Sequence, residues 1–254
     1  MRRHLALLLL AAAALMPLSS SAQQYTGLSG LIHVPSAEMN HEGDAFMGIH
    51  FLNKAMTPDT GFLLAGQKYD TYDYYISLTP FPWIEFSYVC TKRKSAVSEQ
   101  LWDYHRKDRS ASLKLRPIKE GRYIPAIAIG ANDFCTGIFD KNRTYVQLYF
   151  FNYYIAATKH LNFGGNELGL TLAYRHFFRG YNAKWNGLVG GVTFRPAFFP
   201  QARAIVEYTG NEFLVGLDAL LWRHLRLQAS LKDFKYPNFG LCFQLNLLGR
   251  KYTY

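Results

Sequence analysis

The sequence has 254 residues, of which 49% are hydrophobic, 16% aromatic and only 18% charged, against a charged share of about 25% in ordinary soluble domains. Intrinsic disorder is excluded, because a chain this apolar buries enough surface to offset its ordering entropy, and a mean hydropathy of -0.10 argues against a bundle of membrane-spanning helices. The 28 basic residues outnumber the 18 acidic ones and give a net charge of +10, which favours an anionic partner.

The start of the chain has the three-part pattern of a secretory signal peptide. Basic residues precede an apolar run over 5–16, and small residues stand before the bond between Ala22 and Gln23, where we expect cleavage. The apolar run is too short to serve as a membrane anchor. The chain is therefore predicted to consist of a signal peptide, residues 1–22, and one exported domain, residues 23–254. Export places the domain in the cell envelope and removes nucleic acid from the expected partners.

From residue 43 onward, apolar and polar residues alternate with a period of two, the pattern of β-strands with one apolar and one polar face. The alternation is clearest over 168–176, 224–232 and 238–247. Turn signals rich in glycine, proline and asparagine separate the segments. In chain order, the predicted strands are 43–53, 72–79, 83–91, 109–117, 125–133, 147–158, 168–176, 186–195, 202–209, 212–221, 224–232 and 238–247. No linker divides them, so we expect one all-β domain of about twelve antiparallel strands.

Two architectures accommodate such strands, and they place the apolar face on opposite sides. A soluble barrel turns that face inward around a ligand cavity, whereas a transmembrane β-barrel turns it toward lipid and keeps a polar interior. The strand lengths, and aromatic residues near strand ends such as Trp83, Trp185, Trp222 and 198–199, favour an antiparallel transmembrane β-barrel in the outer membrane. A soluble periplasmic ligand-binding barrel is the alternative fold.

The polar faces of these strands carry charged residues of both signs, which the barrel interpretation places in the lumen. They are Glu85, Lys114, Arg116, Arg175, Arg195, Arg203, Glu207, Asp218, Arg226 and Lys232. This net positive set is suited to guiding an anionic polysaccharide. It is equally suited to a plug-like network in which acidic and basic side chains satisfy each other. Both interpretations stay open.

Several segments together resemble a known family. Residues 27–37 read GLSGLIHVPSA, 42–44 read EGD, 78–85 read LTPFPWIE, 124–130 read IPAIAIG and 154–159 read YIAATK. In these features the chain resembles the YjbH-like (YjbH/GfcD-type) outer-membrane proteins of exopolysaccharide and capsule loci, in a single-barrel form. The resemblance covers nearly the whole exported domain and is firmest over 27–160.

The resemblance implies an outer-membrane β-barrel with an accessory role in producing, exporting or modifying an extracellular polysaccharide. Its implied partners are outer-membrane lipid, an anionic exopolysaccharide and other polysaccharide-export proteins. A family motif comprises Gly130, Asp133, Phe134 and Gly137. We place Asp133 in a loop after an apolar strand, where it either binds a sugar hydroxyl or caps a turn. The stretch from Asp133 and Phe134 to Gly137 is one residue shorter than the usual form of this motif.

Catalytic chemistry finds little support in the sequence. No serine lies in a Gly-x-Ser-x-Gly motif, although Ser87 and His50 are candidates if the protein is an outer-membrane enzyme acting on lipid or sugar, the alternative function. Cys90, Cys135 and Cys242 are an odd number without close spacing, so their pairing stays open. Neither metal-ligand spacing nor a phosphate-binding glycine loop is present. We therefore predict no catalytic residues, no metal and no cofactor.

Overall fold

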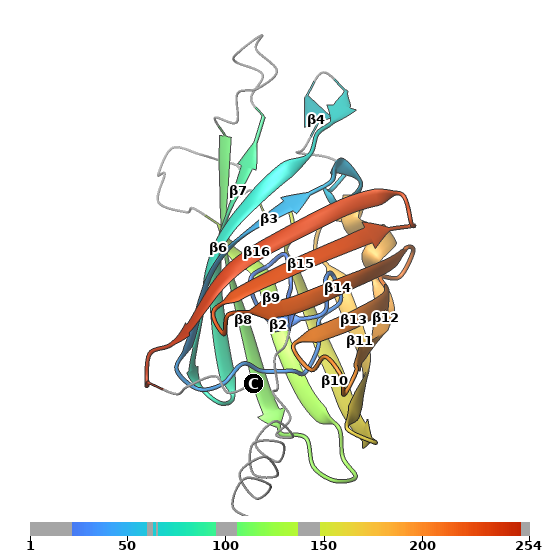
Figure 1. The fold of residues 1–254 in the computed structure, drawn as a ribbon. Coiled ribbons are helices and arrows are strands. Elements are labelled where there is room, and N and C mark those ends of the chain that lie inside the picture. The colour runs from blue at the N-terminus through green and yellow to red at the C-terminus, as the bar shows by residue number, and fades with distance from the viewer. Residues whose placement is uncertain (1–21, 60–62, 65, 95–105, 137–147, 250–254) are drawn as a thin grey trace, which may run out of the picture.

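The computed structural model describes residues 22–59, 63–64, 66–94, 106–136 and 148–249. Within these residues, twelve antiparallel strands form a closed barrel in which β16 pairs with β3 to complete the ring (Figure 1). The barrel strands are β3 (Asp44–Leu52), β6 (Thr71–Phe81), β7 (Ile84–Arg93), β8 (Arg106–Ile118), β9 (Ala126–Thr136), β10 (Asn152–Phe163), β11 (Asn166–Phe177), β12 (Gly187–Arg195), β13 (Ala202–Tyr208), β14 (Phe213–Leu221), β15 (Leu225–Lys232) and β16 (Tyr236–Asn246). The shorter elements are β1 (Ala22–Gln23), β2 (Ser29–Gly30), β4 (Leu63–Leu64), β5 (Gln67–Lys68) and the 3-10 turns η1 (Lys54–Met56) and η2 (Gly180–Trp185).

The two faces of the barrel wall differ in polarity. On β11, Leu172 and Tyr174 point outward and are 59% and 51% exposed, while their neighbours Ala173 and Arg175 point inward and are buried. Similar alternation on the other strands puts large apolar side chains on the outer surface. A soluble protein does not expose so extensive an apolar surface, whereas a transmembrane barrel presents it to lipid. The soluble barrel with an apolar cavity is therefore wrong as a description of this chain.

The prediction of an antiparallel transmembrane β-barrel of twelve strands is confirmed. Each predicted strand corresponds to one barrel strand, and most bounds agree within a few residues. The largest difference is the strand predicted at 147–158, which is β10 in the structure and extends to Phe163. β10 pairs residue by residue with the whole of β11. Pairing with a neighbouring strand, rather than the local pattern, therefore sets where this strand ends.

Successive connections alternate between the two ends of the barrel. Short connections, such as those after β6 and β10, lie at the turn end, while η1, η2 and the longer connections lie at the loop end (Figure 1). Aromatic side chains gather at the turn end, where Phe81 stacks on Trp83 with ring centroids 5.8 Å apart and Trp222 is exposed. Such residues are typical of the lipid–water interface. Trp185, predicted among them, is instead fully buried, because its ring packs against His33 inside the barrel.

The chain before β3 occupies the barrel lumen. This N-terminal segment (residues 22–43, blue in Figure 1) runs through the interior, and every residue from Ala22 to Ala37 is buried. Within it, β1 pairs with β2. Leu31 and Val34 of the segment belong to one apolar cluster with wall residues such as Ile205. The hydrophobic core of this protein therefore forms between the wall and a segment that strand alternation did not predict.

Three further points concern the cysteines, the predicted signal peptide and membrane-spanning helices. Cys90, Cys135 and Cys242 are free thiols. The predicted signal peptide, residues 1–22, lies outside the described residues except for Ala22. In the ranges given above, no helix combines the length and apolarity that crossing a membrane would require.

Candidate functional site

The barrel wall is shaped to receive the N-terminal segment. Gly191 on β12 and Gly216 on β14 face the lumen. A Cβ atom at Gly191 would overlap the side chain of Leu31, and one at Gly216 would lie 2.5 Å from Ile32 Cδ1. Protein interiors are close-packed, so a side chain at either position would force the Leu31 or Ile32 side chain to shift. The two glycines therefore make room for apolar residues of the 27–37 motif.

One buried carboxylate holds the middle of the segment. Glu207 on β13 accepts hydrogen bonds from the backbone N–H groups of Ile32 at 3.0 Å, His33 at 2.7 Å and Val34 at 3.2 Å. Successive N–H groups that converge in this way form a concave anion-binding site, and bonds to an ionised acceptor are stronger than neutral ones. Glu207 therefore binds the segment through its main chain.

Arg175 on β11 binds the same turn of the segment. Its guanidinium donates to the carbonyl oxygens of His33 at 2.9 Å, Trp185 at 3.2 Å and Thr209 at 3.1 Å. Burial and the Arg175 charge lower the pKa of His33 well below its ordinary value, so the imidazole is neutral, and its Nδ1 lies 3.2 Å from the guanidinium. Arg175 thus connects the segment to η2 and to the connection between β13 and β14.

A second set of contacts surrounds β2. The side chains of Lys114 on β8 and Glu85 on β7 are completely buried, and Lys114 Nζ lies 3.1 Å from Glu85 Oε2. Ser29 donates its N–H and hydroxyl to Glu85 at 2.9 and 2.5 Å, and its carbonyl accepts from Lys114 at 2.6 Å. The Asn40 amide donates to Glu85 at 2.7 Å. A buried ion pair needs additional bonds of this kind to offset its desolvation, so the pair and the segment stabilise each other.

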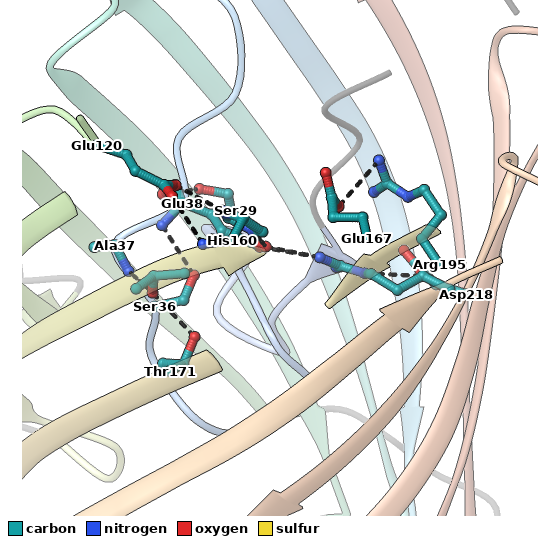
Figure 2. Close-up of polar contacts among 12 residues, drawn as sticks. Ser29, Ser36, Ala37, Glu38, Glu120, His160, Glu167, Thr171, Arg195 and Asp218 are labelled. Carbon is teal, nitrogen blue, oxygen red and sulfur yellow. Dashed lines mark hydrogen bonds and ion pairs between the residues drawn. The ribbon is translucent and has the colours of Figure 1, made fainter. Parts of the chain in front are cut away.

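The segment also adds a charge of its own to the lumen (Figure 2). Glu38 accepts from Arg203 at 2.9 and 3.1 Å, Arg203 donates to Asp218 at 3.2 Å, and Arg226 donates to Asp218 at 2.9 Å. Burial alone would raise the pKa of Glu38, but the Arg203 guanidinium and a bond from His160 outweigh it and hold the pKa well below its ordinary range. Glu38 is therefore an anion in a chain of alternating charges.

His160 on β10 lies between two carboxylates. Its Nε2 is 3.2 Å from Glu38 Oε1, and its Nδ1 is 2.7 Å from Glu120 Oε2 (Figure 2). Both ring nitrogens are engaged, so neither is placed to take a proton from a serine, as a nucleophile–base pair requires. The hydroxyl oxygen of Ser29, whose proton goes to Glu85, lies 3.0 Å from the Glu38 carbonyl oxygen, and the hydroxyl of Ser36 accepts from the Glu38 N–H. His160 on β10 thus links the connection after β8, through Glu120, to the N-terminal segment, through Glu38.

The two residues considered for rim chemistry have separate partners. Ser87 is buried and donates its hydroxyl to the carbonyl of Thr26 at 2.5 Å. His50 is buried and stacks on Tyr75 with ring centroids 4.9 Å apart. Across the described ranges, no group of three or more His, Cys, Asp or Glu residues is arranged to hold a metal ion.

The remaining predicted lumen residues lie toward the two ends of the barrel. Lys232 on β15 is buried and binds Glu212 at 2.7 Å, and Arg195 on β12 is buried and lies 3.5 Å from Glu167. Arg116 differs from the rest of the predicted set, because it is only partly buried and donates to the Pro82 carbonyl at the turn end. It takes no part in holding the segment.

The family motif at 130–137 lies within a strand rather than in the predicted loop. Gly130, Asp133 and Phe134 all belong to β9, and Asp133 has a φ of 52° where the pairing with β8 shifts register. Such a bulge lets a strand continue past a residue that would otherwise end it. The buried Asp133 carboxylate accepts from the N–H of Phe150 at 2.9 Å, and Phe134 is exposed. Gly137 lies outside the described residues.

The segment residues that bind the wall were not predicted from the sequence. Ser29, Glu38 and Asn40 each contact charged wall residues, yet they precede the first alternating strand. The nearest signal is the family-like stretch at 27–37, which contains Ser29, ends just before Glu38 and is rich in small and apolar residues without a period of two. A stretch of that kind between a signal peptide and a first strand indicates a buried, irregular segment.

A closed wall, an apolar exterior and a polar interior filled by a bound segment define a transmembrane β-barrel with an internal plug. The model of the family described as "Exopolysaccharide biosynthesis protein YbjH" (YjbH) matches residues 22–249. The chain belongs to this family, which confirms the resemblance found in its motifs.

Other similarities are more distant or partial. The Escherichia coli (strain K12) "Uncharacterized lipoprotein YjbH" is 31% identical over 130 residues, which make up 49% of this chain and 16% of that protein. The chain thus spans less than two thirds of that relative. Among solved structures, outer membrane phospholipase A from Escherichia coli is 12% identical with a TM-score of 0.37, covering 81% of this chain and 97% of that one. The Salmonella typhi outer membrane phospholipase dimer with bound calcium is 12% identical with a TM-score of 0.39, covering 81% and 91%.

Proposed function

We propose that this chain is an outer-membrane β-barrel that assists the secretion, assembly or surface modification of an exopolysaccharide, with its N-terminal segment as a displaceable plug. Family membership supports the connection with exopolysaccharide biosynthesis. The observation that carries the proposal is that the motif at 27–37 is bound inside the barrel by charged residues of β7, β8, β11 and β13. Half of the ten predicted lumen residues contact the segment: Glu85, Lys114, Arg175, Arg203 and Glu207.

Displacement of the plug would take bonding partners away from several basic side chains of the wall. Glu38 would leave with the segment, and Arg203 would lose one of its two carboxylate partners. Arg175 would lose the His33 carbonyl, and Lys114 would lose its bonds to Ser29. Positively charged linings concentrate anions. Arg175, Lys114 and Arg203 would therefore offer contacts to an anionic polysaccharide in the opened lumen.

The proposed location follows from the exterior of the barrel and from the start of the chain. Residues 1–22 would act as a cleaved signal peptide and deliver residues 23–254 to the outer membrane. The loop end would face the outside, because outer-membrane barrels have short periplasmic turns and longer external loops. The segment joins β3 at the turn end, where Glu42 is exposed. Polysaccharide-export proteins in the periplasm would reach the plug from there.

Exopolysaccharide output tests this role. Deletion of the gene should lower or alter the surface polysaccharide, and the wild-type gene should restore it. Unchanged polysaccharide in a strain that normally makes the protein would refute the role. Fractionation tests the location separately: the protein should require detergent and show heat-modifiable mobility on gels, and recovery as a detergent-free protein would refute the membrane placement.

A further inference from the structure

Three basic side chains gather on the outer face of the barrel at the loop end. Lys92 on β7 stands directly opposite Lys107 on β8, and Arg109 follows two residues later on the same face, opposite Cys90. Thr91 and Asp108, which alternate with them, are buried inside. We call Lys92, Lys107 and Arg109 the basic rim. Cross-strand neighbours of this kind lie within about 5–8 Å of each other.

Several other basic side chains in the described part of the chain have acidic partners. Lys159 binds Glu120 at 3.0 Å, and Lys68 and Lys184 both bind Asp59. Among the described residues, none of the three rim side chains has a carboxylate partner. Like charges directly opposite each other destabilise a strand pair. Their placement here indicates an anionic ligand that neutralises them.

The chemistry below the basic rim indicates what that ligand is. On the same outward face, the next residues toward the turn end include Tyr74 on β6 and Phe86 and Tyr88 on β7, all more than 40% exposed. The basic rim thus lies where the lipid-facing surface ends. A ligand that fits both parts has anionic groups at one end and hydrocarbon chains at the other.

We propose that the basic rim binds the phosphate groups of a phosphorylated membrane lipid, whose acyl chains lie along the aromatic residues below it. The inference rests on the membrane placement under the proposed function, and it adds a specific lipid contact that the plug does not need. Arginine and lysine suit this ligand, since Arg binds phosphate oxygens in a bidentate fork and Lys binds them as a point charge. Two lysines and an arginine around one position match a headgroup with more than one phosphate.

The test compares thermal unfolding in two lipid compositions, read from heat-modifiable gel mobility. Wild-type protein and a K92Q/K107Q/R109Q variant are placed in nanodiscs of phosphatidylcholine, with and without lipid A. Lipid A should raise the unfolding midpoint of the wild type and leave that of the variant unchanged. In phosphatidylcholine alone the variant should be at least as stable as the wild type, because it lacks the like-charge repulsion.

A matched control removes three exposed basic residues from turn-end connections, in a K119Q/R122Q/R223Q variant. It should respond to lipid A as the wild type does. An equal rise in all three proteins would overturn the proposal. So would a rise produced by inorganic phosphate in phosphatidylcholine nanodiscs, since the site would then bind a free anion. Loss of exopolysaccharide output with an intact lipid response would count against the proposed function and leave this site standing.

Discussion

Weakening Glu207 is the most informative perturbation of the plug, because one carboxylate there binds three consecutive main-chain N–H groups at 2.7–3.2 Å. Glu207→Gln keeps the size of the side chain but replaces one oxygen by an NH2 group that cannot accept. At least one bond is lost, and the others lose their charge assistance. A hydrogen bond to a charged group contributes about 1.5–3 kcal/mol, and about 1.4 kcal/mol is a tenfold change in an equilibrium constant. The fraction of barrels with a displaced segment should therefore rise roughly tenfold to a hundredfold.

Single-barrel conductance in planar lipid bilayers measures that fraction as the time spent open. The wild type should be closed for most of the record, and the Glu207→Gln variant should open more often. Glu167→Gln is the matched control, because Glu167 is paired with Arg195 on the neighbouring strand. The control should behave as the wild type. Indistinguishable conductance of Glu207→Gln and the wild type would refute the assignment of Glu207 as the residue that holds the segment.

Three further predictions concern the rest of the lumen. Gly216→Ala should lower the free energy of unfolding in urea, because the new Cβ would lie 2.5 Å from Ile32 Cδ1 and 2.9 Å from the Ala229 carbonyl oxygen, and adding Ile32→Ala should recover the part of the loss that is due to Ile32. Lys114→Met removes one partner of a completely buried ion pair and should cost about 3–5 kcal/mol of that free energy, whereas Lys119→Met at an exposed turn should change it by less than about 0.5 kcal/mol. The folded pKa of Glu38 is lowered, so its stabilisation of the bound segment is complete above the unfolded pKa of about 4.3 and is lost as the pH falls below that value. Protease protection of the segment should therefore fall in acid, and Glu38→Gln should flatten the dependence.

Each of these has an outcome that contradicts it. A Gly216→Ala loss that Ile32→Ala leaves unchanged would show that Ile32 does not crowd the space beside β14. Equal costs at Lys114 and Lys119 would show that the buried ion pair is not formed. Protection that is equally pH-dependent with and without the Glu38 carboxylate would assign the acid sensitivity to another group.

The barrel wall was predictable because one physical rule repeats along it. Each strand separates lipid from a polar interior, so a period of two appears wherever the chain crosses. The pattern located all twelve strands and put Glu207 and Arg175 on the polar face. It could not distinguish a lumen that guides a polymer from one filled by a plug, because both require the same charged side chains.

The plug was not predictable by that rule, since its contacts are not periodic. Ser29 and Glu38 bind residues on β7, β8 and β13 that lie far along the chain. Trp185 was wrongly predicted to lie at the lipid interface for a related reason. An aromatic residue near a strand end can face either lipid or a filled interior, and the local sequence does not distinguish the two. Asp133 resembled the start of a loop because a bulge uses the same residue types as a turn.

The position of the 27–37 motif inside the barrel is the claim on which the proposed function depends, and an engineered disulfide tests it directly. In a background without the natural cysteines, Leu31→Cys is combined with Gly191→Cys, where a Cβ would contact the Leu31 side chain. A disulfide requires Cβ atoms about 3.5–4.5 Å apart. Mild oxidation of the folded protein in lipid should link 31 to 191, and should not link 31 to a cysteine at Gly240 on β16. Absence of the 31–191 link, or equal linking of both pairs, would contradict a plug bound in the lumen.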